Sequence, residues 1–201
     1  MGSRDHIEAT AAGAGAHPVA GEVGVQSAAG LAALLGHVLA VLDTLDPAQL
    51  EPADEHRLVV ALTQFRDRFD AARAGLTEHW EHRRAWAADG SLSAAARLAR
   101  EAKLSVPTAR RDLSRARHLC RMPATAAAVA AGRLSMDHVD LLAKADQPWR
   151  SAVFADQESL LVEQCARQRV FSDARRVVDY WVQRAASKRS RNCVRATTSR
   201  C

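Results

Sequence analysis

The sequence lacks the features of a membrane or secreted protein. No apolar run reaches the roughly 18 residues of a transmembrane helix, and the N-terminus has no basic start followed by an apolar stretch. The four cysteines, Cys120, Cys165, Cys193 and Cys201, form no C-x-x-C pair and no regular framework. This usage fits free thiols in a reducing compartment. We therefore expect a cytoplasmic protein without membrane contact.

The sequence also lacks the alternating pattern of β-strands and the glycine-rich loop of phosphate-binding sites. Apolar residues instead recur at intervals of three or four through the middle of the chain. This spacing predicts an all-α fold, a multi-helix bundle over residues 28–186. We expect a disordered head over residues 1–27, and a disordered tail over residues 187–201 that carries five basic and no acidic side chains.

The longest predicted helix covers residues 53–88. Its large apolar residues lie three or four positions apart and form one stripe, consisting of Leu58, Leu62, Phe65, Phe69, Ala72, Leu76 and Trp80. Such a stripe is expected to be buried against another surface. That surface belongs either to the core of this chain or to a second chain, so a homodimer through this helix is one predicted association.

Positive charge is concentrated in residues 91–122. This window holds eight Arg or Lys and two acidic residues, whereas the rest of residues 1–186 holds 15 basic and 21 acidic side chains. The window predicts two short helices joined by a tight turn, the outline of a helix-turn-helix. The first covers residues 94–102, and Ser105 is the expected N-cap of the second, with Pro107 in its first turn.

The second of these helices separates its side chains into two faces. With about 100° per residue, the apolar arc contains Ala109, Leu113, Ala116, Leu119 and Cys120. The opposite arc is basic and polar, and contains Arg110, Arg111, Ser114, Arg115, Arg117, His118 and Arg121. The apolar arc is expected to pack against the body of the protein.

A basic helical face of this kind favours contact with double-stranded DNA through phosphates and base edges. The residues predicted to make this contact are Arg97, Arg100, Lys103, Thr108, Arg110, Arg111, Arg115 and Arg117. A second interpretation is equally physical: the arginines form a solvated helix face or pair with the acidic remainder of the chain. Both interpretations stay open at the level of the sequence.

One group of metal-binding residue types occurs on the long helix. Glu78, His79, Glu81 and His82 lie within five residues, and histidines at i and i+3 could share an ion. No third convincing ligand accompanies them, so the polar face of an amphipathic helix is the favoured interpretation. We expect no metal site, no cofactor and no catalytic residue.

A longer string of motifs points to a known family. The order DGS, AARLARE, KLS, ARRDLSRARHL, MP and AAGRLSMDHVDLL resembles the actinobacterial thirteen-E-twelve repeat family, a helical domain of unknown function, over about residues 30–186. In that family the domain commonly precedes an HNH endonuclease module. The resemblance thus implies a DNA-associated setting but no activity for the helical domain itself.

The sequence departs from the longer members of that family. An HNH site needs a metal-binding histidine, a general-base histidine and usually an orienting asparagine. This chain has one asparagine, Asn192, and no histidine after His138. We therefore expect a non-catalytic domain, the truncated N-terminal part of an HNH-endonuclease-like protein.

Overall fold

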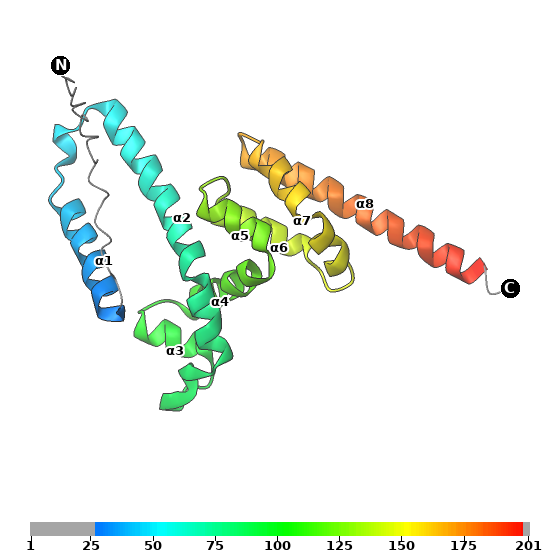
Figure 1. Cartoon of the computed structure of the whole chain (residues 1–201), viewed down its shortest axis with the longest axis horizontal. Coiled ribbons are helices and arrows are strands. Elements are labelled where there is room, and N and C mark those ends of the chain that lie inside the picture. Colours follow the sequence, from blue (N-terminus) through cyan, green and yellow to red (C-terminus); the bar gives the residue numbers. More distant parts are fainter. Residues whose placement is uncertain (1–26, 199–201) are drawn as a thin grey trace, which may run out of the picture. The chain divides into compact units, whose positions relative to one another are not determined.

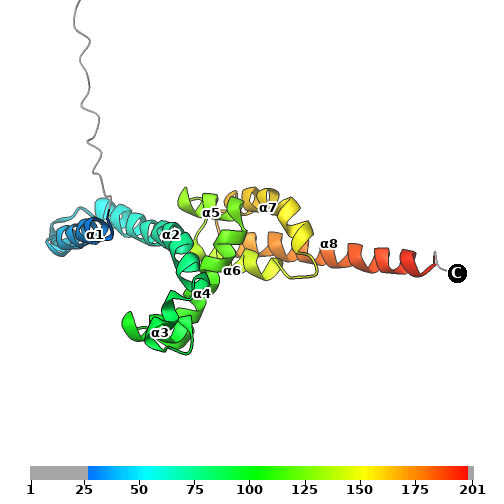
Figure 2. The same ribbon diagram turned by 60° about the horizontal axis from the view of Figure 1, so that its bottom comes forward.

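A computed structural model describes residues 27–198 of the chain, with side chains up to residue 187. The chain divides into two compact units, residues 1–50 and residues 51–201. All regular elements within the described residues are helical (Figures 1 and 2), which confirms the predicted all-α fold. The predicted disordered head lies outside the described residues, except for Ser27.

The first unit contains helix α1 (Ala28–Asp43) and the short 3₁₀ helix η1 (Pro47–Gln49). Ser27 caps α1 because its hydroxyl accepts a hydrogen bond of 3.0 Å from the N–H of Gly30. Asp46 caps η1 in the same way, with 3.0 Å to the N–H of Ala48. No residue of α1 is buried, so its apolar side chains form no core among the described residues of this unit.

The second unit begins with the longest uninterrupted helix of the chain, α2 (Pro52–His82). Pro52 occupies the first turn, and Asp54 and Glu55 complement the positive end of the helix dipole. The helix stops earlier than the predicted residue 88, because Arg84 adopts a left-handed backbone with φ of 56°. The chain then turns into the 3₁₀ helix η2 (Ala85–Asp89), and the Trp86 indole N–H donates to the Glu81 carbonyl at 3.2 Å.

Six further helices complete the second unit. They are α3 (Ala94–Glu101), α4 (Val106–Arg121), α5 (Pro123–Ala130), α6 (Met136–Ala145), α7 (Ser151–Ala166) and α8 (Phe171–Thr198). Gly132 ends α5, with φ of 71° and with the N–H of Arg133 donating to the Ala128 carbonyl at 2.8 Å. None of the helices within residues 27–198 has the length and apolar character that a membrane span requires.

Helix α8 continues to Thr198, whereas we predicted a helix end near residue 186 and a disordered tail from residue 187. The predicted boundary was therefore too early. The physical reason is that residues 171–198 contain neither proline nor glycine, so nothing in the backbone interrupts the helix. Residues 199–201 lie outside the described residues.

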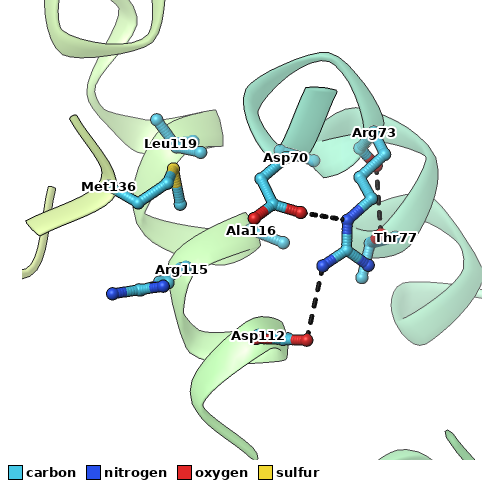
Figure 3. A pocket seen from close by; sticks show the side chains of 9 residues that line it. Asp70, Arg73, Thr77, Asp112, Arg115, Ala116, Leu119 and Met136 are labelled. Carbon is cyan, nitrogen blue, oxygen red and sulfur yellow. Dashed lines mark hydrogen bonds and ion pairs between the residues drawn. The ribbon is translucent and has the colours of Figure 1, made fainter. Parts of the chain in front are cut away.

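Helices α2 and α4 are joined by a charged bridge (Figure 3). The guanidinium of Arg73 donates to Asp70 on its own helix at 2.8 Å and to Asp112 on α4 at 3.3 Å. Arg73 and both carboxylates are partly withdrawn from solvent. One arginine thus fixes the register of the two helices and neutralises two acids at their contact.

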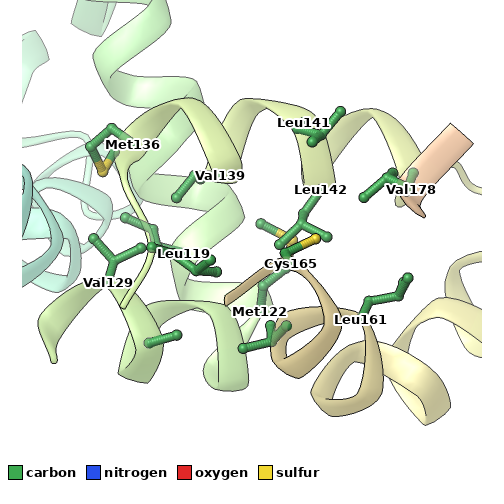
Figure 4. Close-up of a cluster of buried hydrophobic side chains, with 14 of the residues drawn as sticks. Leu119, Met122, Val129, Met136, Val139, Leu141, Leu142, Leu161, Cys165 and Val178 are labelled. Atoms are coloured by element: carbon green, nitrogen blue, oxygen red, sulfur yellow. The ribbon is translucent and has the colours of Figure 1, made fainter. Parts of the chain in front are cut away.

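The main core lies among α4, α5, α6, α7 and α8, as the close-up in Figure 4 shows. Its largest fully buried side chains include Leu142, Val139, Val129 and Met122, and Met122 alone separates α4 from α5. A smaller cluster joins α3 to α4. It consists of Ala94, Ala95, Ala99, Ala109 and Leu113, with Trp80, Trp86 and Leu98 packed against it.

Side chains from distant helices cap both ends of the short helix α5. The carboxylate of Glu158 on α7 is buried and accepts hydrogen bonds from the Thr125 N–H at 2.7 Å and the Thr125 hydroxyl at 2.8 Å. At the other end, the Arg68 Nε on α2 donates to the Ala130 carbonyl at 2.9 Å. These bonds satisfy backbone groups that an eight-residue helix leaves unpaired.

Helix α6 is capped in the same manner. The buried Asp67 of α2 accepts a bond of 3.3 Å from the Met136 N–H, and Ser135 and His138 form a capping box. The buried guanidinium of Arg150 donates to the carbonyls of Ala145 and Lys144 at the opposite end. The positions of α5 and α6 are thus fixed by hydrogen bonds from α2, from α7 and from the segment before α7.

Substitution of Glu158 by alanine is expected to lower the free energy of unfolding by about 2–4 kcal/mol, because a buried donor pair at Thr125 loses its acceptor. Urea denaturation followed by circular dichroism measures this change. The matched control is Glu163→Ala on the same helix, which removes an exposed ion pair with Arg133. Equal losses for the two variants would contradict the capping role of Glu158.

The protein is expected to lose stability as the pH falls from 7 to 5. Burial lowers the pKa of His138, and its neutral Nδ1 accepts the Ser135 N–H at 3.2 Å. The unfolded chain takes up a proton at about pH 6.5 while the folded chain resists it, so this contribution is present above that pH and lost below it. Burial and the Arg121 charge lower the pKa of His118 in the same direction.

The free energy of unfolding at several pH values measures this effect in the wild type and in His138→Gln. Glutamine keeps an acceptor for the capping box but does not titrate. The variant should therefore show a shallower pH dependence, with the remainder due to His118. An unchanged slope between pH 7 and 5 would show that His138 is not coupled to folding.

Candidate interaction surfaces

Helices α3 and α4 form a pair joined by four residues, the turn predicted from the basic window. Ser93 caps α3 and Ser105 caps α4, accepting backbone hydrogen bonds of 3.1 and 3.2 Å. The N–H of Leu104 donates to the Ala99 carbonyl at 2.8 Å, and Lys103 takes a left-handed backbone with φ of 55°. This is a Schellman motif in which lysine occupies the position that glycine usually fills.

The predicted faces of α4 are confirmed with one exception. Ala109, Leu113, Ala116 and Leu119 are buried, as expected for the packed arc. Cys120, which we also placed on the packed arc, is exposed. It lies at the edge of that arc, where a small angular shift decides whether a side chain faces the core or solvent. The basic arc faces outward, so its members are available for ion pairs or ligands.

The two arginines of α3 bind carboxylates of this chain. Arg97 donates to Glu101 at 2.9 Å and to the carbonyls of Ala85 and Trp86 at 3.1 and 3.3 Å. Arg100 forms an ion pair with Asp89. Hydrogen bonds from Ser91 and from Arg100 lower the pKa of Asp89 to about 2. Both arginines therefore hold η2 against α3.

Two arginines of α4 are also paired. Arg115 binds Asp140 of α6 in a two-pronged contact, with Nε and Nη2 at 2.9 and 2.6 Å from the two carboxylate oxygens. The hydrogen bond and charge of Asp140 raise the pKa of Arg115 despite its partial burial. Arg117 binds Glu81 of α2 through Nε and Nη2, at 2.8 and 3.2 Å. These contacts join α4 to the helices on either side of it.

The other predicted DNA-binding residues remain at the surface. Lys103, Arg110 and Arg111 are exposed, and within the described part of the chain their side chains make no hydrogen bond or ion pair. Thr108 is half-buried, and its hydroxyl lies 2.9 Å from that of Ser105 in the helix cap. The exposed basic edge is thus the α3–α4 turn and the second turn of α4, which we call the α4 basic edge (Lys103, Arg110 and Arg111).

Sequence reasoning missed the Arg73 bridge and the role of Asp112. The signal that could have indicated them is the spacing of Asp70 and Arg73 at i and i+3 on the polar side of α2. Asp112 is one of only two acids in the basic window, and the structure places it 3.3 Å from Arg73. Without knowledge of which helices are neighbours, that pairing has no sequence signature.

Most of the apolar stripe of α2 is exposed, so the core of this chain, one of the two surfaces predicted to cover the stripe, leaves most of it open within the described residues. The exposed fractions are 39% for Leu62, 51% for Phe65, 39% for Phe69 and 72% for Leu76. Ala72 is exposed as well, while Leu58 and Trp80 are half-buried. We call these seven residues the α2 stripe, and they define a candidate interaction surface of the second unit.

The face of α2 that packs on α4, α5 and α6 is the opposite one. Asp67 and Ala74 are buried there, and Ala71 packs against the main core. Ala74 and Leu76 are two residues apart, which places them about 200° apart around the helix. Small side chains permit close approach, and the charged ones cap α5 and α6. The inner face was missed because it carries few large apolar residues.

No group of three or more His, Cys, Asp or Glu side chains within the described residues is arranged to hold a metal ion. The sequence also groups Glu78, His79, Glu81 and His82 on α2. Of these side chains, the Glu81 carboxylate accepts a hydrogen bond from Arg117. The candidate interaction sites of the second unit are therefore two surfaces, the α2 stripe and the α4 basic edge.

These features define a multi-helix domain with two candidate interaction surfaces. The chain belongs to the family described as Domain of unknown function (DUF222), which matches residues 56–200. The match confirms the predicted helical domain of unknown function, while the actinobacterial origin stays a prediction. No curated protein and no solved structure matches the chain. The association with an HNH endonuclease stays a prediction.

Removal of the side chain of Arg115 or Asp140 is expected to lower the free energy of unfolding, because either change breaks the ion pair between them. A double-mutant cycle with Arg115→Ala and Asp140→Ala should give a coupling energy of about 1 kcal/mol, because Asp140 is partly exposed and solvent screens the pair. Arg110→Ala is the control and should change stability by less than about 0.5 kcal/mol. A coupling energy near zero would mean that Arg115 does not hold α4 to α6.

Proposed function

We propose that this chain is a helical association module that forms a dimer through the α2 stripe. The observation that carries the proposal is the orientation of α2, whose large apolar side chains from Leu62 to Leu76 are exposed and belong to neither core cluster of its own unit. Contiguous exposed apolar surface of this kind marks interaction sites in soluble proteins.

The energetic argument rests on Leu62, Phe65, Phe69 and Leu76. Full burial of one such side chain contributes about 1.5–3 kcal/mol. These four lie along one line of the helix, and Phe65 stacks on Phe69 with ring centroids 6.3 Å apart. A partner helix laid along this line would cover all four at once. The fold of the second unit does not need them, since its core lies on the other side of α2.

The variant Leu62→Glu with Leu76→Glu is expected to abolish dimer formation, because two charges would be buried in each half of the apolar contact. Light scattering and sedimentation velocity over a range of concentrations measure the mass. The control is Leu160→Glu, which places the same charge at an exposed leucine of α7. A wild-type chain that stays monomeric at every concentration would refute the proposed function.

Contact with double-stranded DNA is the second candidate function. The α4 basic edge favours it, since Lys103, Arg110 and Arg111 are exposed and have no partner within the described residues. Carboxylates of this chain already bind four of the predicted DNA-binding residues, namely Arg97, Arg100, Arg115 and Arg117. The candidate DNA contact is therefore limited to the α4 basic edge. Phosphate contact by three cations gives weak, strongly salt-dependent binding.

The double variant Arg110→Ala with Arg111→Ala is expected to weaken DNA binding. It should also reduce the slope of log Kobs against log salt concentration by about 2, since two phosphate contacts are lost. Gel shifts of the full chain on a short duplex at increasing salt measure both quantities. The control, Arg169→Ala with Arg175→Ala, removes the same charge from exposed positions elsewhere. Equal weakening by both pairs would show non-specific charge attraction, and no binding at low salt would exclude this candidate.

A further inference from the structure

The charges at the two ends of α2 have opposite signs. Asp54 and Glu55 lie in its first turn, and Arg83 and Arg84 follow its last residue. Glu55 and Arg83 are exposed, and their side chains make no hydrogen bond or ion pair within the described residues. The α2 stripe lies between these ends. Any helix that covers the stripe therefore meets an acidic end and a basic end.

Five of the seven positions in the stripe are symmetric about Phe69, whereas the positions that mirror Phe65 and Ala72 hold Arg73 and Arg66. Leu62 lies seven residues before Phe69 and Leu76 seven residues after it, and Leu58 and Trp80 each lie eleven residues from it. Glu55 and Arg83 are each fourteen residues from the same centre. This symmetry is what a surface needs in order to pair with itself, because a two-fold interface places position i against position j and j against i.

We propose that α2 pairs antiparallel with α2 of a second copy of this chain, with Phe69 on the two-fold axis. The inference rests on the proposed function and specifies its partner, direction and register. Leu62 then faces Leu76 of the second copy. Leu58 approaches the half-buried Trp80, which also packs against the cluster that joins α3 to α4 in its own chain. The stacked rings of Phe65 and Phe69 from both copies meet at the centre of the contact.

Charge complementarity selects the direction of the pair. In the antiparallel arrangement, Glu55 of each copy faces Arg83 of the other, so two ion pairs close the ends of the stripe. The helix dipoles also align favourably, since the N-terminal end of one helix lies beside the C-terminal end of the other. A parallel pair would place Glu55 beside Glu55 and Arg83 beside Arg83, which is repulsive at both ends.

The register is tested by cysteine cross-linking in the full chain. The background carries Cys120→Ser, Cys193→Ser and Cys201→Ser and keeps the buried Cys165. Leu62→Cys together with Leu76→Cys should give a covalent dimer with a short bismaleimide reagent, and mass spectrometry should identify the peptide that joins positions 62 and 76. Leu62→Cys alone should not cross-link, since the two copies of position 62 would lie about 21 Å apart along the helix axis.

The direction is tested independently by charge exchange. Glu55→Arg alone and Arg83→Glu alone are each expected to raise the dimer dissociation constant about tenfold, because two attractive contacts become repulsive. The double variant should return it to within about twofold of the wild type, since both ion pairs re-form with reversed polarity. Circular dichroism shows whether each variant keeps its fold, since Glu55→Arg also removes a carboxylate from the first turn of α2.

The outcomes separate this inference from the proposed function. A monomeric wild type refutes both. A dimer in which Leu62→Cys alone cross-links is parallel, so the proposed function stands and the antiparallel inference fails. A dimer that shows neither the link between positions 62 and 76 nor rescue by the double charge exchange also overturns the inference. The predicted link together with the rescue establishes the direction and the register.

Discussion

The second unit depends on hydrogen bonds that charged side chains make to the ends of two short helices. Helices α5 and α6 are eight and ten residues long, too short to be stable alone. Glu158 and Arg68 cap the two ends of α5, while Asp67 and Arg150 contribute to the caps of α6. These contacts place helix ends inside the bundle without unpaired backbone groups. The apolar core around Leu142 is therefore built without the free-energy cost of burying unpaired polar groups.

The localised positive charge of residues 91–122 has a structural use that composition alone does not reveal. Arg97 and Arg100 hold η2 through Asp89. Arg115 holds α6 through Asp140, and Arg117 holds α2 through Glu81. The acidic excess in the rest of the body supplies these carboxylates. Many of the basic side chains in this window therefore form ion pairs that hold α3 and α4 in the bundle.

Local signals in the sequence predicted the helices well. Ser93, Ser105 and Gly132 act within a few residues of their own position, and the buried face of α4 follows from its period. The contacts that set the arrangement were not predictable in this way. Glu158 and Thr125 are 33 residues apart, and Asp67 and Met136 are 69 residues apart. Such pairs depend on which helices are neighbours, and a single sequence does not contain that information.

The inner face of α2 was not identified from the sequence for a related reason. Large apolar residues usually mark the inner face of a helix, but α2 places small and charged residues inside. The side chains from Leu62 to Leu76 on its outer face belong to neither core cluster. In the proposed dimer, substitutions at these positions would change the contact between the copies while leaving the folded unit intact. Surfaces of this kind allow one helical scaffold to acquire new specificities in small steps.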